Sequence, residues 1–134
     1  MKEKLKSCLV LFKVFFKIGL FTFGGGYAML PIIQKEIIEN HNWISEETLI
    51  DFVAVSESTP GPFAVNMATY VGSTVGGILG AACATLGVVL PSFLIILLVA
   101  RIYEKFKTNK IVMGCMSGLK PAVVGLIASA ILSI

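Results

Sequence analysis

The sequence predicts an all-α membrane protein, a polytopic helical bundle in which some helices are broken or re-entrant. Of its 134 residues, 56% are hydrophobic and 14% are charged, and no charge occurs between Thr59 and Ala100. The mean hydropathy of +0.89 is far above that of soluble domains. Clusters of glycine and proline interrupt the apolar runs, which predicts helix breaks at membrane depth.

The rest of the composition excludes other classes of protein. The net charge of +3 comes from basic residues at segment ends, without the interleaved aromatic residues of a nucleic-acid-binding surface. The cysteines, Cys8, Cys83 and Cys115, lack metal-site spacing and are better explained as small apolar side chains. The single histidine, His41, lies in a polar stretch that predicts a solvated turn. We therefore expect no enzymatic activity, metal, cofactor or nucleic-acid partner.

The first helix is predicted from Leu5 to Phe23, about 19 residues, which is close to the ~20 needed to cross the hydrocarbon core. Its lysines share one face, and we expect the opposite face to carry Leu9, Phe12, Phe16 and Leu20. Two interpretations of the lysines remain open. They reach lipid phosphates at the membrane surface, or Lys17, the deepest, attracts an anion into a polar pathway.

Three consecutive glycines, Gly24, Gly25 and Gly26, should end this helix, because each costs ~1 kcal/mol against alanine in a helix interior. A short helix is expected to start near Tyr27, with Pro31 tolerated in its first turn. The bare backbone between the two helices must be buried in protein or face water. Transporters build ion sites in this way.

A second break is predicted at Pro60-Gly61-Pro62, after a helix that runs from the N-cap Ser45 to about Thr59. Glu57, just before this break, is an acid inside the apolar region and a candidate for proton coupling. A salt bridge and a position at the membrane surface are the alternatives. Asn66, one turn after the break, is expected to hydrogen-bond either another helix or a transported ligand.

The uncharged run must turn back once, because residues 62 to 103 would form a helix of roughly 60 Å. The turn is expected between Gly76 and Ala82. Small residues recur at every fourth position and are expected to pack the two arms together: Ala64, Ala68, Gly72, Gly76, Gly80 and Ala84.

A third break is predicted at Gly118-Leu-Lys-Pro121, where Lys120 would stand beside a new helix start. An anion site and an ordinary interfacial lysine are the two interpretations of Lys120. The last apolar run, Ala122 to Ile134, is too short to cross the membrane. Residues 1–134 are therefore expected to be one membrane domain that is incomplete at its C-terminal end.

Several motifs together resemble the chromate transporter family, in order and over nearly the whole chain. They are Phe-Lys-Ile-Gly-Leu-Phe-Thr-Phe-Gly-Gly-Gly-Tyr-Ala-Met-Leu-Pro at 16–31, Trp43-Ile-Ser-Glu-Glu47, Thr59-Pro-Gly-Pro-Phe-Ala-Val-Asn66, Ala68-Thr-Tyr-Val-Gly72, Val89-Leu-Pro-Ser-Phe93 and Gly118-Leu-Lys-Pro-Ala-Val-Val124. The Phe-Gly-Gly-Gly and Pro-Gly-Pro motifs are each weak alone. Together, at this spacing, they are specific.

The resemblance implies a multi-pass transporter of an oxyanion, chromate or sulfate, in the cytoplasmic (inner) membrane. It also implies that the chain is one half of an inverted-repeat transporter and works as a dimer, most simply antiparallel, with itself or with a second half-size subunit. Alternating access is expected at a site built from the helix breaks. The alternative is a non-transporting membrane subunit that packs against another membrane protein.

The residues expected to bind the anion are those of the three breaks and their polar neighbours. They are Lys17, Gly24, Gly25, Gly26, Pro60, Gly61, Pro62, Asn66 and Lys120, with Glu57 as the candidate for proton coupling.

Overall fold

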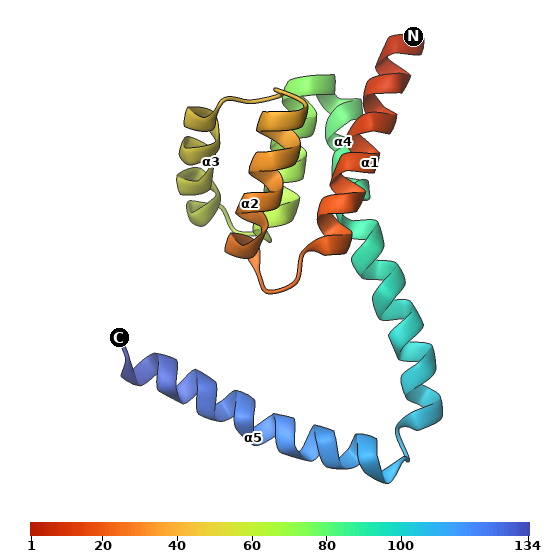
Figure 1. The fold of residues 1–134 in the computed structure, drawn as a ribbon, viewed down its shortest axis with the longest axis vertical. Helices are drawn as coiled ribbons and strands as arrows, with labels where there is room; N and C mark the ends of the chain where they lie inside the picture. The colour runs from red at the N-terminus through yellow and green to blue at the C-terminus, as the bar shows by residue number, and fades with distance from the viewer. The chain divides into compact units, whose positions relative to one another are not determined.

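The structure is a computed structural model that describes residues 1–134, and helices are its only regular elements (Figure 1). In chain order they are α1 (Lys2–Phe21), the 3₁₀ turn η1 (Gly26–Met29), α2 (Leu30–Ile33), the π-helical η2 (Gln34–Asn40), α3 (Glu46–Ser58), α4 (Phe63–Phe106) and α5 (Lys110–Leu132). The predicted all-α class is confirmed. The chain divides into two compact units, Met1–Ile95 and Ile96–Ile134, which are described separately.

Helix α1 buries a different face from the one predicted. Its buried side chains are Leu11, Val14, Phe15 and Ile18, whereas the predicted face was Leu9, Phe12, Phe16 and Leu20. At about 100° per residue, the observed four lie opposite the lysines, while the predicted four lie nearer the lysine side. The shared lysine face was read correctly, but the apolar face assigned opposite to it was wrong.

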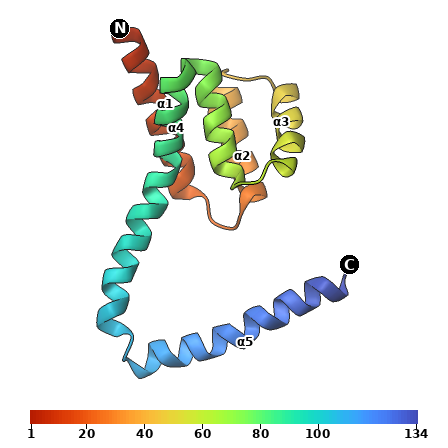
Figure 2. The same ribbon diagram turned by 180° about the vertical axis from the view of Figure 1, so that it is seen from behind.

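Helix α4 folds back on itself, as the length of the apolar run predicts. Gly77 has non-helical backbone angles (φ 64°, ψ −149°) and separates a first arm from a second arm (Figures 1 and 2). An added Cβ at Gly72 would lie 2.5 Å from the Gly80 carbonyl oxygen and 2.8 Å from the Ala84 Cβ. The predicted turn is therefore confirmed, as is the packing of the two arms at Gly72, Gly80 and Ala84, whereas Gly76 faces Leu11 of α1.

Two glycines allow α1 to lie against the second arm of α4 (Figure 2). An added Cβ at Gly19 would lie 2.5 Å from the Val88 carbonyl oxygen, and one at Gly87 would lie 2.7 Å from the Phe12 carbonyl oxygen. Any side chain at either position would therefore push the two backbones apart. The core of the first unit, including Phe15 and Val88, forms along this contact.

Helix α3 begins at the predicted cap, since the Ser45 hydroxyl accepts a hydrogen bond from the Thr48 amide. The helix packs on the first arm of α4 through Phe52. The centroid of this ring lies 6.5 Å from that of Phe63 and 4.7 Å from that of Tyr70. These contacts fix the ends of the loop that contains the Pro60-Gly61-Pro62 motif.

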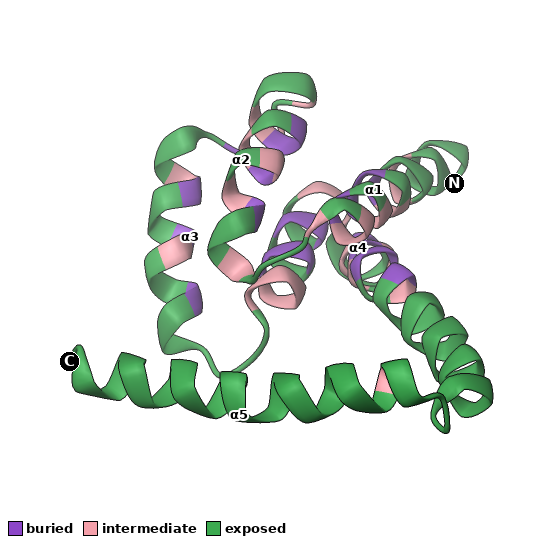
Figure 3. Ribbon diagram, turned by 60° about the horizontal axis from the view of Figure 1, so that its bottom comes forward, coloured by how far each residue is buried: buried purple, intermediate pink, exposed green.

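The second unit corrects the predicted third break. Residues Lys110–Leu132 form one helix with Pro121 inside it, so no new helix starts beside Lys120. An interior proline costs about 3 kcal/mol because it removes a hydrogen bond and crowds the preceding turn. Membrane helices tolerate this cost because the freed carbonyl finds other partners. Lys120 is exposed, and no residue of α5 is buried (Figure 3).

Two helices, α4 and α5, are long and apolar enough to cross a membrane, with mean hydropathies of 2.6 and 1.8. Helix α5 joins the apolar runs on either side of Pro121 into one helix of 23 residues, so the last run is not the separate short segment that was expected. Helix α1, which carries Lys13 and Lys17, is not among the two. These properties are those of a helical membrane protein.

Candidate functional site

The glycine motif forms the turn between α1 and η1. Gly24 and Gly25 have φ angles of 109° and 99°, a region that strains any residue with a Cβ. Gly26 is needed for a different reason, because an added Cβ would lie 2.9 Å from the Cβ of Phe63. Phe63 is the first residue of α4 and directly follows the Pro60-Gly61-Pro62 motif. The two motifs, far apart in sequence, therefore meet in space.

A cleft of about 310 Å³, here called the glycine cleft, lies at this meeting point. Its walls come from the glycine turn, the start of α4, α1 and the second arm of α4. The lining residues include Gly25, Gly26, Pro62, Phe63, Ala64, Thr22 and Ser92. No charged side chain is among the residues that line it.

The glycine cleft offers hydrogen-bond donors without a full positive charge. The first amides of a helix have no partner within the helix, and the helix start carries about half a positive charge. Phe63 and Ala64 supply such amides at the start of α4, and the bare backbone of Gly25 and Gly26 lies beside them. Donors of this kind replace the water around an anion.

A second cleft of about 210 Å³, here called the Glu57 cleft, adjoins the first. It is lined by Ser56 and Glu57 of α3 and by Tyr27, and it shares Gly26 and Phe63 with the glycine cleft. The Glu57 carboxylate is exposed and forms no ion pair, since the chain's single ion pair lies elsewhere. No salt bridge therefore forms at Glu57 within the chain.

Asn66 lies over Gly61. Gly61 has a φ of 152°, and an added Cβ there would lie 3.0 Å from the Asn66 Oδ1. The Asn66 Nδ2 is buried and has no hydrogen-bond partner. Neither residue lines the glycine cleft. Asn66 therefore offers an unused donor behind the Pro60-Gly61-Pro62 loop.

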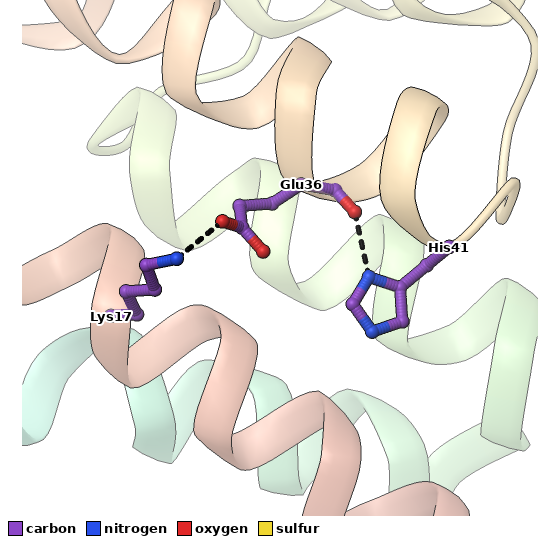
Figure 4. A network of polar contacts seen from close by, with 3 residues as sticks. All are labelled: Lys17, Glu36 and His41. Carbon is purple, nitrogen blue, oxygen red and sulfur yellow. Dashed lines mark hydrogen bonds and ion pairs between the residues drawn. The ribbon is translucent and has the colours of Figure 1, made fainter.

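Lys17 has a partner that was not predicted. Its Nζ lies 2.6 Å from the Glu36 Oε1, so α1 is joined to η2 (Figure 4). The Glu36 side chain is 9% exposed and that of Lys17 is 57% exposed. Glu36 lies outside the two candidate membrane-crossing helices, and the Lys17 ammonium lowers the pKa of its carboxyl from the ordinary value. An anion at Lys17 would have to compete with this carboxylate.

His41 makes contacts that a solvated turn does not predict. Its Nδ1 lies 2.8 Å from the Glu36 backbone carbonyl oxygen, at the end of η2 (Figure 4). Its ring stands 4.5 Å, centroid to centroid, from Trp43. His41 thus helps to end η2, and it is only half-buried.

The structure brings together four of the predicted site residues. Gly25, Gly26 and Pro62 line the glycine cleft, and Glu57 lines the adjoining cleft. The others line neither cleft: Lys17, Gly24, Pro60, Gly61, Asn66 and Lys120.

Sequence reasoning missed Thr22, Ser92 and Glu36. Thr22 and Ser92 stand in two motifs that carried the family resemblance, as isolated hydroxyls in apolar runs, and that was the available signal. Glu36 gave no such signal. Lys17 and Glu36 are 19 positions apart in the sequence, and their pairing depends on how α1 and η2 face each other.

The fold and the clefts define a helical membrane protein with a cleft that no charged side chain lines, at the meeting of two glycine-containing turns. Its sequence matches the profile of the family described as Chromate transporter over residues 9–134, and the chain belongs to that family. The resemblance noted from the sequence motifs is therefore confirmed. No solved structure matches the chain significantly.

Curated relatives come from bacteria and archaea. The chain is 34% identical over 113 residues to an uncharacterized transporter of Methanocaldococcus jannaschii, covering 84% of this chain and 28% of the relative. It is 30% identical over 115 residues to an uncharacterized transporter of Bacillus subtilis, covering 86% and 65%. It is 34% identical over 123 residues to the chromate transport protein of Pseudomonas aeruginosa, covering 92% and 29%. The chain thus spans less than two thirds of the length of these relatives.

Proposed function

We propose that this chain moves an oxyanion, chromate or sulfate, across the cytoplasmic membrane and binds it in the glycine cleft. The observation that carries this proposal is the meeting of Gly25 and Gly26 with the start of α4. Membership of the chromate transporter family supports transport, and two relatives named as chromate transport proteins support the class of substrate.

The chemistry of the cleft suits a tetrahedral dianion. Such an ion must shed much of its hydration, and backbone amides at a helix start replace water without bringing in a counter-charge. The positive φ angles of Gly24 and Gly25 turn the chain sharply and leave its backbone without side-chain cover. The proposed binding groups are the backbone amides of Gly25, Gly26, Phe63 and Ala64. Pro62, which has no amide hydrogen, shapes the start of α4, and Asn66 is a donor that an anion reaches when the loop moves.

Glu57 is the proposed site of proton coupling. Its unpaired carboxylate lines the cleft that adjoins the anion site. A proton bound by Glu57 would reduce the repulsion between this carboxylate and a neighbouring dianion. Proton and anion would then bind favourably together, as symport requires.

The proposed working unit is a dimer that gives alternating access to the cleft. Two non-helical connections flank the cleft, the glycine turn and the Pro60-Gly61-Pro62 loop, and either can absorb a rocking motion. Helix α5 buries none of its residues, and added Cβ atoms at Gly114, Gly118 and Gly125 would meet nothing within 4 Å. A helix that exposes glycines in this way allows close packing by another membrane helix.

The experiment that tests this proposal is uptake of radiolabelled sulfate and of chromate into vesicles that contain the purified chain. We expect uptake above that of empty vesicles. Gly25→Leu should abolish it, because leucine is strained at a φ of 99° and covers the amides. Gly76→Ala is the matched control, since an added Cβ there makes an ordinary 3.6 Å contact.

Two results would contradict the proposal. Equal uptake by wild type and a folded Gly25→Leu variant would show that the glycine cleft is not part of the transport pathway. No uptake of any oxyanion, together with stable co-purification of an unrelated membrane protein, would favour a non-transporting subunit instead.

A further inference from the structure

We propose that the Ser92 hydroxyl donates a hydrogen bond to the anion in the glycine cleft. This inference rests on the proposed function and adds a side-chain ligand that the helix breaks themselves do not supply. Ser92 lies on the second arm of α4, whereas the breaks lie at the glycine turn and at the start of the first arm.

The first observation is position. Ser92 lines the glycine cleft together with Gly25, Gly26 and Pro62. Pro91, directly before it, is buried, while Ser92 is exposed toward the cleft side of the helix. Val88, one turn earlier, is held against Gly19 of α1 and also lines the cleft. The helix that carries Ser92 is therefore fixed by packing, as a ligand-bearing helix should be.

The second observation is that the Ser92 hydroxyl is unused. Every other serine and threonine hydroxyl in residues 1–95 forms a hydrogen bond, most of them to a carbonyl three or four residues earlier. That local bond is the ordinary choice for a hydroxyl on a helix. Ser92 makes neither this bond nor any other. The contrast sets it apart from the neighbouring hydroxyl of the same cleft, since Thr22 bonds to the Ile18 carbonyl.

The chemistry selects an anion as the partner. At membrane depth an unpaired hydroxyl is unfavourable, so Ser92 needs water or a ligand. The start of α4 offers backbone amides to the cleft, and no lysine or arginine lines it. The Ser92 hydroxyl can donate beside these amides to an acceptor-only ligand, which a fully deprotonated oxyanion is.

The test measures sulfate binding to the purified chain and, separately, the KM and maximal rate of sulfate uptake. Ser92→Ala is expected to raise both the Kd and the KM about tenfold, as for loss of one hydrogen bond to a charged group. The maximal rate per folded molecule should change less than threefold. Ser92→Thr keeps the hydroxyl and should restore most of the affinity. Ser58→Ala is the matched control, because its hydroxyl bonds to the Val55 carbonyl.

The outcomes separate this inference from the proposed function. Sulfate binding and uptake by wild type, with Ser92→Ala unchanged in Kd and KM, would overturn the role of Ser92 alone. Sulfate binding without uptake would overturn the proposed transport. The Kd of Ser92→Ala, compared with that of wild type, would still decide whether Ser92 binds the anion. Loss of affinity in both Ser92→Ala and Ser92→Thr, with lower thermal stability, would indicate a packing role and also overturn the inference.

Discussion

At the scale of single residues, the Lys17–Glu36 pair joins α1 to η2 with one charge exposed and the other almost fully buried. Removing Lys17 leaves the Glu36 carboxylate without its counter-charge. Because water reaches the pair from the lysine side, we expect Lys17→Gln to destabilise the fold by about 1–2 kcal/mol, less than for a fully buried pair. The measurement is thermal unfolding in detergent, with Lys13→Gln on the same face as control.

The pair also predicts a dependence on pH. The folded-state pKa of Glu36 is lowered from its ordinary value of 4.5, so the pair stabilises the fold above that value. This stabilisation is lost as the pH falls through the lowered folded-state pKa, and Glu36→Gln should lack it. If Lys17 instead binds the anion, Lys17→Gln would raise the KM for uptake and leave thermal stability unchanged.

Glu57 leads to a second prediction at this scale. Glu57→Gln removes the carboxylate from the Glu57 cleft, so uptake driven by a pH gradient should fall at least tenfold. Exchange of labelled for unlabelled sulfate, which needs no net proton movement, should persist. Asp51→Asn is the control, as an exposed acid on the same helix. If a pH gradient drives uptake equally well in Glu57→Gln and Asp51→Asn, Glu57 is not the coupling residue.

At the scale of elements, the contact of α1 with the second arm of α4 depends on Gly19 and Gly87. Gly87→Leu should separate the two helices, because even a Cβ would lie 2.7 Å from a backbone oxygen of Phe12. Overpacking of this kind costs typically 1–3 kcal/mol. We expect a lower unfolding temperature and loss of uptake, whereas Gly76→Ala should keep both. A stable and active Gly87→Leu variant would contradict this helix contact.

The same elements show what sequence can and cannot predict. The fold-back at Gly77, the Ser45 cap and the packing of Gly72 on Gly80 followed from length and local chemistry. The continuity of α5 through Pro121 did not, because a proline marks a helix end in water but is tolerated in an apolar helix. The Lys17–Glu36 pair and the place of Ser92 in the cleft depend on how helices face one another. No local sequence pattern indicates how the helices face one another.

At the scale of the whole molecule, an antiparallel homodimer requires the chain to insert in both orientations. The N-terminus and the residues around Lys105–Lys110 are both basic, so the charge bias is weak and compatible with both orientations. Tags at the two ends, probed with a membrane-impermeant reagent in intact cells, should each be accessible in about half of the molecules. A single fixed orientation would exclude this homodimer and require a different second subunit.

The central claim is that the glycine cleft binds the transported anion, and thiol labelling tests it most directly. Cys8, Cys83 and Cys115 are first replaced by serine, and Ala64→Cys then places one thiol in the cleft. Sulfate should slow the reaction of this thiol with a maleimide several-fold, while an equal concentration of chloride should not. Ile78→Cys, at a residue that is 90% exposed and outside the cleft, should react at the same rate with either anion. An unchanged labelling rate at position 64 in sulfate that is shown to be transported would contradict the claim.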